Sequence, residues 1–221
     1  MPKKVLLSWS SGKDSAWSLR CLSGMPDVQV VGLLTTFTQT FDGVAMHAVR
    51  RPLVEAQAEA AGLPLRAVPL PWPCSNDQYE RILGEVCRAA VAEGIAAVAF
   101  GDLFLADIRA YRERQLAGTG LEPLFPLWQL PTAELAREMI RSGLRARLTC
   151  VDPRALPPQF AGREFDDALL HEFPAAVDPC GENGEFHSFV YDGPMFRRPV
   201  AIQTGEIVER DGFVFADLLP G

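Results

Sequence analysis

The stretch Val5-Leu6-Leu7-Ser8-Trp9-Ser10-Ser11-Gly12-Lys13-Asp14-Ser15 decides the fold of this chain. Its apolar beginning predicts a short buried strand, its small polar residues predict a tight turn, and a helix is expected from Lys13. The start of a helix exposes unpaired backbone N–H groups and the positive end of the helix dipole, so anions bind there. The hydroxyl groups of Ser10, Ser11 and Ser15 add donors, and Gly12 lets the backbone approach a ligand closely. The stretch therefore predicts a phosphate-binding loop.

Asp14 is the unexpected residue in this loop. A carboxylate beside a phosphate is repelled unless a cation lies between them, and Mg²⁺ commonly binds one or two carboxylates together with phosphate oxygens. We therefore expect Mg²⁺ at Asp14 and an added positive charge from Lys13. The Walker A pattern does not fit, because its first glycine position is Leu7 and Lys13 is followed by Asp14. The plainer alternative is a serine-capped helix that happens to begin with Lys-Asp.

Outward from this loop, apolar runs alternate with helical patterns. Strands are expected at 28–37, 65–70, 96–100 and 124–128, and helices at 52–61, 79–90 and 107–116. Strands that are apolar on both faces and alternate with helices predict a Rossmann-like α/β fold, with a parallel sheet covered by helices on both faces. Ligands bind beyond the carboxyl ends of such strands. Segments 8–14, 35–51, 71–77 and 101–107 are therefore expected to converge on one crevice.

The pattern changes after Pro131. A helix is expected at 132–142 and strands at 146–151, 189–191, 200–208 and 213–215, with a proline-rich stretch at 153–158 that interrupts regular structure. This mixture, in which strands no longer alternate with helices, predicts a smaller C-terminal α+β lobe. We expect two domains, a phosphate-binding α/β domain over 1–130 and a substrate-binding α+β domain over 131–221.

Composition limits the class of protein. The 221 residues are 48% hydrophobic and 22% charged, which is ordinary for a globular protein and excludes a disordered or fibrous one. The formal net charge of −7 argues against nucleic-acid binding, which needs many Lys and Arg. No apolar run suits a signal peptide or a membrane helix. The five scattered cysteines form no C-x-x-C pair, so a reduced, cytoplasmic protein without a membrane partner is expected.

Further candidate residues follow the fourth expected strand. Gly101 and Asp102 leave this strand at the ligand edge of the sheet. We expect Asp102 or Asp107 near Mg²⁺ or substrate, and Arg109 and Arg114 against phosphate or an acidic substrate. The alternative is an Asp-rich start of a helix whose arginines are solvated, and the sequence favours the functional interpretation only because strand ends face the ligand.

The chain resembles the diphthine–ammonia ligase family, N-type ATP pyrophosphatases of the adenine-nucleotide alpha-hydrolase superfamily, along nearly its whole length. The segments that carry the resemblance are Ser8 to Ser15, Gly101-Asp102-Leu103-Phe104, Asp107-Ile108-Arg109, Pro126-Leu127-Trp128 and Cys180-Gly181-Glu182-Asn183-Gly184-Glu185-Phe186-His187. Two positions depart from the family pattern. Ser11 stands where glycine is usual. The segment Glu182-Asn183-Gly184-Glu185 stands where the diphthamide-making members usually show Glu-Gly-Gly-Glu, so Asn183 replaces a glycine. This second departure bears on the acceptor more than on the ATP chemistry.

The resemblance implies an amide-forming ligase whose ATP-binding domain is 1–130. ATP would be cleaved between its α- and β-phosphates to adenylate a carboxylate, and ammonia would then displace AMP. Pyrophosphate would lie in the loop, and the adenosine would extend towards Thr35 and Thr36. Glutamine-using amidating enzymes often carry a cysteine after Met1, where this chain has Pro2, so free ammonia or ammonia from a partner is expected.

The resemblance also assigns roles to single residues. Lys13 and Asp14 would act on the phosphates, and the carboxylates of Glu182 and Glu185 would accept protons from ammonia or hold its cation. Substrate would contact Gly181, Asn183, Gly184 and His187. An ordinary acidic turn before a strand is the alternative, and a metal site from Cys180, Glu182 and His187 matches no known spacing. His47 would contact the nucleotide or be a solvated loop residue.

Two alternatives stay open for the function. The acceptor is either the diphthine residue of translation elongation factor 2, as the resemblance implies, or a small carboxylate metabolite. A protein of another class, which senses ATP or AMP without turnover, is the second hypothesis. Asp14 speaks against it, because a mere binder has little need of a carboxylate beside the phosphates. Whether the chain forms a homodimer is also open.

Overall fold

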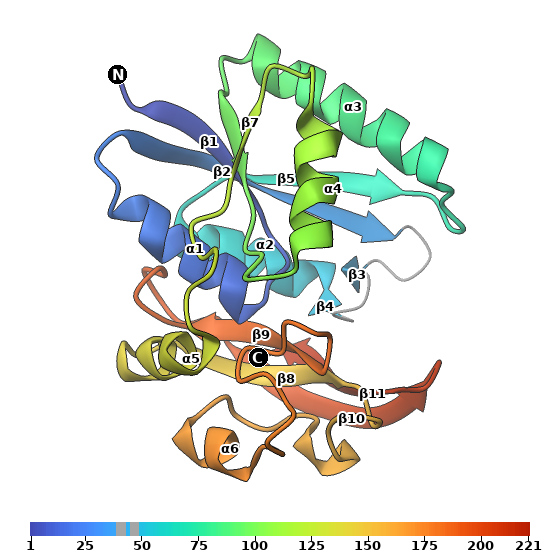
Figure 1. Ribbon diagram of the computed structural model, residues 1–221. Coiled ribbons are helices and arrows are strands. Elements are labelled where there is room, and N and C mark those ends of the chain that lie inside the picture. The colour runs from blue at the N-terminus through green and yellow to red at the C-terminus, as the bar shows by residue number, and fades with distance from the viewer. Residues whose placement is uncertain (39–42, 45–48) are drawn as a thin grey trace.

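The computed structural model describes residues 1–38, 43–44 and 49–221. Five strands form a parallel sheet in the order β5-β2-β1-β6-β7 (Figure 1). Their bounds in that order are Leu65–Leu70, Val28–Thr38, Lys3–Ser8, Ala97–Ala99 and Glu122–Leu124. The Rossmann-like α/β architecture expected from the alternating pattern is confirmed.

Helices cover both faces of this sheet (Figure 1). They are α1 (Lys13–Ser23) and α2 (Arg51–Ala61) on one face, and α3 (Asn76–Ala92) and α4 (Ala106–Leu116) on the other. Successive side chains of a strand point to opposite faces. Val5 and Leu7 of β1 accordingly join the core cluster of α1 and α2, whereas Leu6 joins the cluster of α3 and α4. The central strand is therefore apolar on both faces, as a buried parallel strand must be.

Some element boundaries differ from those expected. The strand expected at 124–128 lies earlier in the chain, as β7 at Glu122–Leu124, and residues 126–129 form a turn that begins at Pro126. Helix α3 begins at Asn76, because Ser75 and Gln78 form a capping box that satisfies the first backbone N–H groups. Two short strands that the sequence did not predict extend the sheet: β3 (Gly43–Val44) pairs antiparallel with β2, and β4 (Val49–Arg50) pairs antiparallel with β3.

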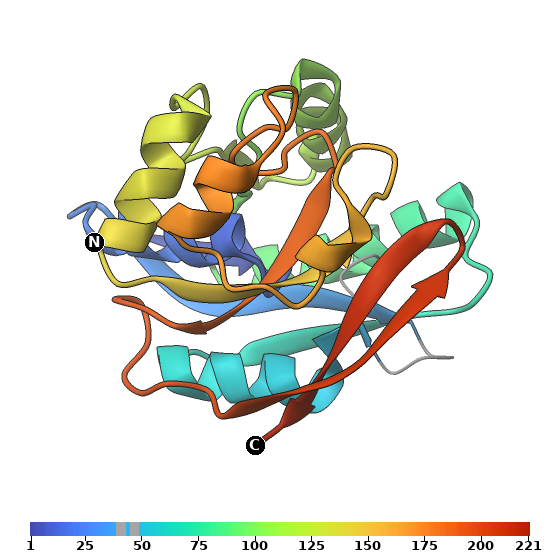
Figure 2. The ribbon, with the colours of Figure 1, turned by 90° about the horizontal axis from the view of Figure 1, so that it is seen from below.

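The C-terminal part forms a second, antiparallel sheet in the order β10-β11-β8-β9. The strands are β8 (Arg145–Val151), β9 (Phe186–Asp192), β10 (Ile202–Arg210) and β11 (Phe213–Pro220), and the red β10–β11 hairpin is long in Figure 2. Helices α5 (Thr132–Arg141) and α6 (Asp167–Glu172) and the short 3-10 helix η1 (Pro158–Phe160) accompany this sheet. The smaller α+β lobe is confirmed, and the proline-rich stretch is irregular as expected up to its last residue, Pro158, where η1 begins.

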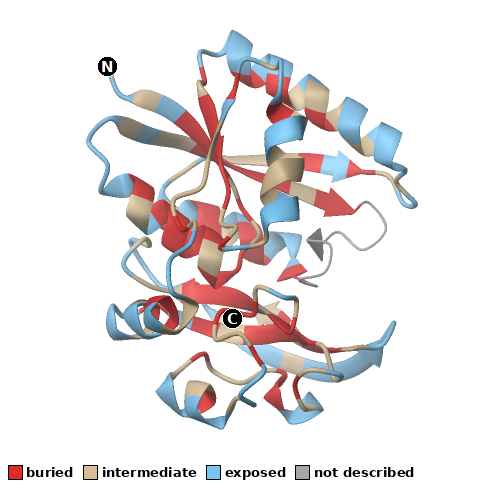
Figure 3. Cartoon of the chain, in the orientation of Figure 1, coloured by how far each residue is buried: buried red, intermediate tan, exposed pale blue. Residues whose placement is uncertain are grey.

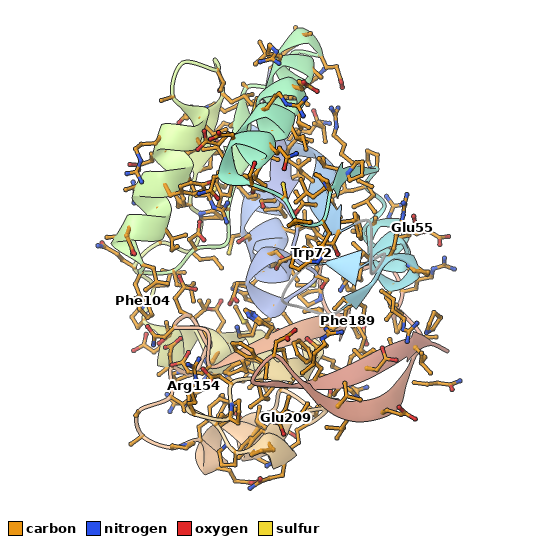
Figure 4. All side chains as sticks on the ribbon, turned by 90° about the vertical axis from the view of Figure 1, so that its right-hand side faces the viewer. Glu55, Trp72, Phe104, Arg154, Phe189 and Glu209 are labelled. Atoms are coloured by element: carbon orange, nitrogen blue, oxygen red, sulfur yellow. The ribbon has the colours of Figure 1, made fainter. Side chains whose placement is uncertain are left out.

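The C-terminal sheet packs directly against the loop that follows β1. The backbone N–H of Val190 donates to the carbonyl of Ser11 at 3.0 Å, and the N–H of Lys13 donates to Ser188 Oγ at 3.2 Å. One hydrophobic cluster runs through both lobes, and the buried residues in Figure 3 continue across their junction. Phe189 of β9, which is fully buried, lies at this junction in Figure 4. The second lobe therefore supports the loop between β1 and α1 through β9.

Two further properties concern the whole described chain. No helix within residues 1–38, 43–44 and 49–221 is both long enough and apolar enough to cross a membrane. The five cysteines are all free thiols, as the scattered spacing predicted.

Candidate active site

Two cavities meet where β1, β2 and β6 end. The smaller, of about 290 Å³, lies over the loop between β1 and α1, and its walls carry mostly polar side chains. The larger, of about 550 Å³, is mostly apolar and lies towards β2, α3 and α4. Five residues line both: Ser8, Ser10, Phe100, Arg112 and His187. The two cavities thus form one continuous crevice at the carboxyl ends of the strands, where the fold was expected to place a ligand.

The expected phosphate loop forms the floor of the smaller cavity. Ser10, Gly12, Lys13, Asp14 and Ser15 all line it. The hydroxyl of Ser15 donates to the carbonyl of Gly12 at 2.9 Å and lies 3.2 Å from Ser10 Oγ. These short side chains brace the turn from within, while the N–H groups of Gly12 and Lys13 donate to Ser10 Oγ and Ser188 Oγ. The turn leads into the start of α1, the kind of position that binds anions.

Ser11 takes a backbone conformation that favours glycine. Its φ is +71°, and its side chain is fully buried beneath the loop, so it does not reach the cavity in the described structure. The Ser11 carbonyl accepts hydrogen bonds from Val190 N–H and from the Gln57 side-chain amide, both at 3.0 Å. Ser11 consequently shapes the loop with its backbone, and the hydroxyl expected to bind a ligand points away from the site.

Gln57 is a residue that sequence reasoning missed. It lies on the inner face of α2 and is completely buried. Its amide nitrogen donates to the carbonyls of Ser11 and Val190, and its amide oxygen accepts from the Trp9 indole N–H at 2.8 Å. One side chain therefore ties the loop to both lobes. The available signal was a glutamine in line with Leu53, Val54 and Ala60 on an otherwise apolar helix face.

Lys13 points down into the junction of the lobes instead of out into solvent. Its ammonium group lies 2.9 Å from Asp14 Oδ2, donates to the carbonyl of Cys180, and sits 5.1 Å from the centre of the Phe186 ring. Burial disfavours this charge, but Asp14 and the other acidic groups around it hold the pKa of Lys13 above its usual value. Lys13 therefore stays protonated and adds positive charge beneath the loop.

Gly101 and Asp102 lie where β6 ends, on the wall of the smaller cavity. A Cβ atom on Gly101 would lie 3.1 Å from the backbone of Asp14 and Ser15, so only glycine lets this strand end approach the start of α1 so closely. Asp102 pairs loosely with Arg112, whose Nε lies 3.7 Å from Asp102 Oδ2. Burial raises the pKa of Asp102 above its ordinary value, although Arg112 opposes the shift.

Glu182 enters the smaller cavity from the C-terminal lobe. Its Oε1 accepts a 2.7 Å hydrogen bond from the backbone N–H of Leu103, which follows β6. Burial raises the pKa of Glu182 to about 7 despite that hydrogen bond, so this carboxyl group can exchange a proton near neutral pH. His187 lines both cavities, and burial lowers its pKa to about 4, which leaves it neutral.

The rest of the 180–187 segment builds a tight turn. Gly181 and Gly184 have φ values of +70° and +86°, and both line the smaller cavity. Glu185 is buried, and its carboxylate accepts hydrogen bonds from the backbone N–H groups of Asp178 and Asn183 at 2.9 and 3.0 Å. Neither Glu185 nor Asn183 lines either cavity within the described residues. The catalytic role expected for Glu185 and the substrate contact expected for Asn183 therefore find no support, because both side chains hold the turn.

Three expected substrate residues on α4 lie away from the crevice. In the described part of the chain, none of Asp107, Arg109 and Arg114 lines either cavity. Arg109 stacks on the Trp128 ring, 4.7 Å from its centre, and pairs with Glu113. The helix instead turns Arg112, which the sequence did not single out, towards both cavities. His47 lies outside the residues that the structure describes.

The larger cavity contains Thr35 and Thr36, as expected from their place at the end of β2. The Thr35 hydroxyl is committed to the carbonyl of Trp9 at 2.8 Å, which anchors the loop to the strand. Around them the walls are formed mainly by Leu34, Leu83, Val98, Phe100, Ile108 and Leu116. The segment 71–77, in contrast, does not reach this cavity within the described structure, where Tyr79 of α3 takes its place.

The described residues could hold a metal together with a bound ligand. Among the described residues, no three His, Cys, Asp or Glu side chains are close enough to form a metal site. Both oxygens of Asp14 lie near Lys13 Nζ, at 2.9 and 3.1 Å. A single carboxylate fits Mg²⁺ where phosphate oxygens and water complete the coordination, as this ion usually prefers.

Fold and site together define a class of protein. It is a Rossmann-like α/β protein whose serine-rich strand-to-helix loop is closed over by an acidic turn from a C-terminal antiparallel lobe. Residues 131–216 match the family model of the diphthamide synthase C-terminal domain.

Similarity to characterised proteins extends over both lobes. The chain is 27% identical to the diphthine–ammonia ligases of Bos taurus and Homo sapiens, over 94% of its own length and 85% of theirs. It is 29% identical to that of Danio rerio, over 94% of this chain and 89% of the relative. The chain thus resembles the diphthine–ammonia ligase family over nearly its whole length, which confirms the resemblance seen in the sequence.

Proposed function

We propose that this chain is an ATP-dependent, amide-forming ligase that acts as a diphthine–ammonia ligase. The observation that carries the proposal is the pair of joined cavities at the strand ends. A polar cavity over a serine-rich helix start suits a pyrophosphate group, and the adjoining apolar cavity of about 550 Å³ suits a nucleoside. The names of the relatives add the substrates, diphthine and ammonia.

The proposed chemistry follows from the quality of the leaving group. A carboxylate cannot expel oxide, so one of its oxygens first attacks the α-phosphorus of ATP and pyrophosphate departs. Ammonia nitrogen then attacks the acyl carbon, the bond to AMP breaks, and one proton is released as the amide forms. Each step separates charge that fixed donors of the protein can stabilise without reorganisation.

The residues around the polar cavity divide these tasks. The N–H groups at the start of α1 would bind pyrophosphate, with Lys13 adding positive charge from beneath. Asp14 is the residue that would hold Mg²⁺, which when bound neutralises negative charge on the phosphate oxygens. Glu182, whose pKa is about 7, would take the proton released by ammonia, because its carboxyl group lines the cavity and can be ionised at neutral pH.

The two lobes would then have separate parts. Residues 1–130 would bind ATP, and residues 131–221 would position the acceptor through the turn that carries Glu182. The names of the relatives give diphthine as the acceptor, and the resemblance noted in the sequence implies that this residue belongs to elongation factor 2. Asn183 departs from the usual glycine, but its side chain bonds Glu185 within the turn and leaves the cavity wall to Gly184. A small carboxylate remains the other acceptor to be tried.

The proposal is tested by the products of turnover. The protein is incubated with ATP, Mg²⁺, ammonium and elongation factor 2 that carries diphthine, and the nucleotides and the acceptor mass are measured. We expect AMP and pyrophosphate in equal amounts, and conversion of one carboxylate to an amide. ATP binding without AMP from diphthine or from a panel of small carboxylates would favour a nucleotide sensor. ADP as the product would show that a different bond is cleaved.

A further inference from the structure

The junction of the two cavities carries one positively charged side chain, Arg112, that has no part in the function proposed above. Of the five residues that line both cavities, Arg112 is the one with a permanent charge, and His187 is neutral at physiological pH. Among the described residues, Arg112 is also the only Lys or Arg on the wall of the larger cavity. Lys13, the other cation of the crevice, lies beneath the loop in the smaller one.

Arg112 is held in place but leaves a donor free. Its guanidinium carbon lies 5.0 Å from the centre of the Phe100 ring, at the end of the fourth parallel strand. Its Nε lies 3.7 Å from Asp102 Oδ2, a distance too long for a hydrogen bond. Both atoms are buried and have no hydrogen-bond partner in the described part of the chain. A buried N–H of a charged group without an acceptor is costly, so the Arg112 Nε–H indicates a missing hydrogen-bond acceptor.

The position of Arg112 relates it to one phosphate in particular. The α-phosphate is the group that joins the nucleoside of ATP to its pyrophosphate. If pyrophosphate binds over the loop and adenosine in the apolar cavity, the α-phosphate must lie where the cavities meet. We propose, on the basis of the ligase function above, that Arg112 binds the α-phosphate of ATP and stabilises the charge of its oxygens as the carboxylate attacks.

The chemistry of a guanidinium group suits this role. It is planar, offers several N–H donors in a fixed geometry, and keeps its charge at any physiological pH. Because the α-phosphate stays with AMP, the same contact would also stabilise AMP as the leaving group when ammonia attacks. Phe100 and Asp102 act as positioning residues, since they hold the guanidinium from the ring face and from the side.

A binding experiment tests the contact without turnover. Affinities for AMP, adenosine and pyrophosphate are measured by calorimetry for the wild type, for Arg112→Met and for Arg137→Met. Arg137 is an exposed arginine of α5 that lines neither cavity among the described residues, so its variant controls for the loss of one charge. We expect Arg112→Met to weaken AMP binding at least about tenfold and to leave adenosine and pyrophosphate within about twofold of the wild type. Unchanged AMP affinity, or an equal loss for adenosine, would overturn the proposal.

A second variant protects the test against a folding defect. Arg112→Lys keeps the charge but loses the planar fork, and we expect its AMP affinity to fall between those of the wild type and Arg112→Met. In the turnover assay, kcat of Arg112→Met should fall at least about 100-fold. A wild type that forms no AMP from any acceptor would refute the ligase function, whereas the AMP and adenosine affinities would still decide the contact. A Met variant with wild-type kcat and AMP affinity would refute the contact alone.

Discussion

The side-chain amide of Gln57 donates a 3.0 Å hydrogen bond to the carbonyl of Ser11, the residue that sits in the loop with a φ of +71°. The same amide bonds Val190 of the C-terminal sheet, so the loop is fixed between α2 and the second lobe. A residue other than glycine can keep a left-handed conformation when its surroundings determine it. The shape of the phosphate loop in this chain is therefore imposed by tertiary contacts.

Gln57→Leu should destabilise the protein and loosen the loop. The substitution leaves the buried Trp9 indole N–H without its acceptor and removes one hydrogen bond from each of two carbonyls. A buried unsatisfied donor costs about 1–3 kcal/mol, so we expect the free energy of unfolding in urea to fall by that amount. Pyrophosphate affinity, measured by calorimetry, should fall as well. Wild-type values in both measurements would show that Gln57 does not shape the loop.

Ser11→Gly should have the opposite effect on stability. Glycine adopts a positive φ without strain, and the change also removes a buried hydroxyl that has no partner in the described structure. The gain is offset in part by the greater freedom of glycine in the unfolded chain. We expect the free energy of unfolding to rise by up to about 1 kcal/mol, with pyrophosphate affinity unchanged. A loss of pyrophosphate affinity would mean that the Ser11 hydroxyl contacts the ligand after all.

Gly101→Ala should disturb the start of α1 from the opposite side. The new Cβ would lie 3.1 Å from backbone atoms of Asp14 and Ser15, which cannot move without shifting the loop. Overpacking of this kind costs about 1–3 kcal/mol, and pyrophosphate affinity should decline with the loop geometry. Gly84→Ala on α3 is the matched control, because its Cβ meets only the end of the Arg88 side chain at 3.6 Å. That control should be neutral or slightly stabilising, and equal effects of the two substitutions would contradict the close approach at Gly101.

The raised pKa of Glu182 predicts that the free energy of unfolding depends on pH. Its pKa is about 7 in the folded protein and 4.5 ordinarily, so the folded state binds more protons between these values. Stability contributed by this group is therefore lost as pH rises from 4.5 to 7. Glu182→Gln should remove that loss, and the difference in unfolding free energy between the two proteins should grow by about 1–3 kcal/mol across this range. A difference that is constant with pH would mean that Glu182 titrates normally.

The same carboxyl group should govern the rate. If Glu182 accepts the proton from ammonia, kcat rises with pH through about 7 as the carboxylate forms. Glu182→Gln should lower kcat about 100-fold or more and leave ATP affinity within a few-fold of the wild type. An equal loss of ATP affinity would place Glu182 in the nucleotide pocket, and a wild-type rate would remove it from the mechanism.

Local patterns in the sequence predicted the layout of the site but not its inner contacts. The apolar run before Ser8 and the helix start at Lys13 placed the loop at the ligand edge, and Thr35, Thr36 and Asp102 do line the crevice. Such predictions succeed because a parallel sheet brings its strand ends to one edge whatever the side chains are.

What sequence reasoning missed depends on contacts between distant segments. On α4 the sequence favoured Arg109 and Arg114, but the rotation of the helix against Phe100 turns Arg112 inwards instead. Helical periodicity alone does not fix this rotation, since the helix carries few apolar residues. Glu182 and Glu185 looked alike in the sequence. Glu182 accepts a hydrogen bond from the backbone N–H of Leu103 across the lobe junction, whereas Glu185 accepts one from Asp178 within its own turn. Only the packing of the second lobe against the first gives the two carboxylates different roles.

The central claim is that the triphosphate of ATP lies across the joined cavities, with its pyrophosphate over the loop between β1 and α1. A crystal structure with Mg²⁺ and α,β-methylene-ATP, which cannot be cleaved at the α–β bond, tests it most directly. We expect the β- and γ-phosphates at the N–H groups that open α1, Mg²⁺ between them and Asp14, and the base in the apolar cavity beside Thr36. A nucleotide bound elsewhere, with that helix start free of phosphate, would contradict the account.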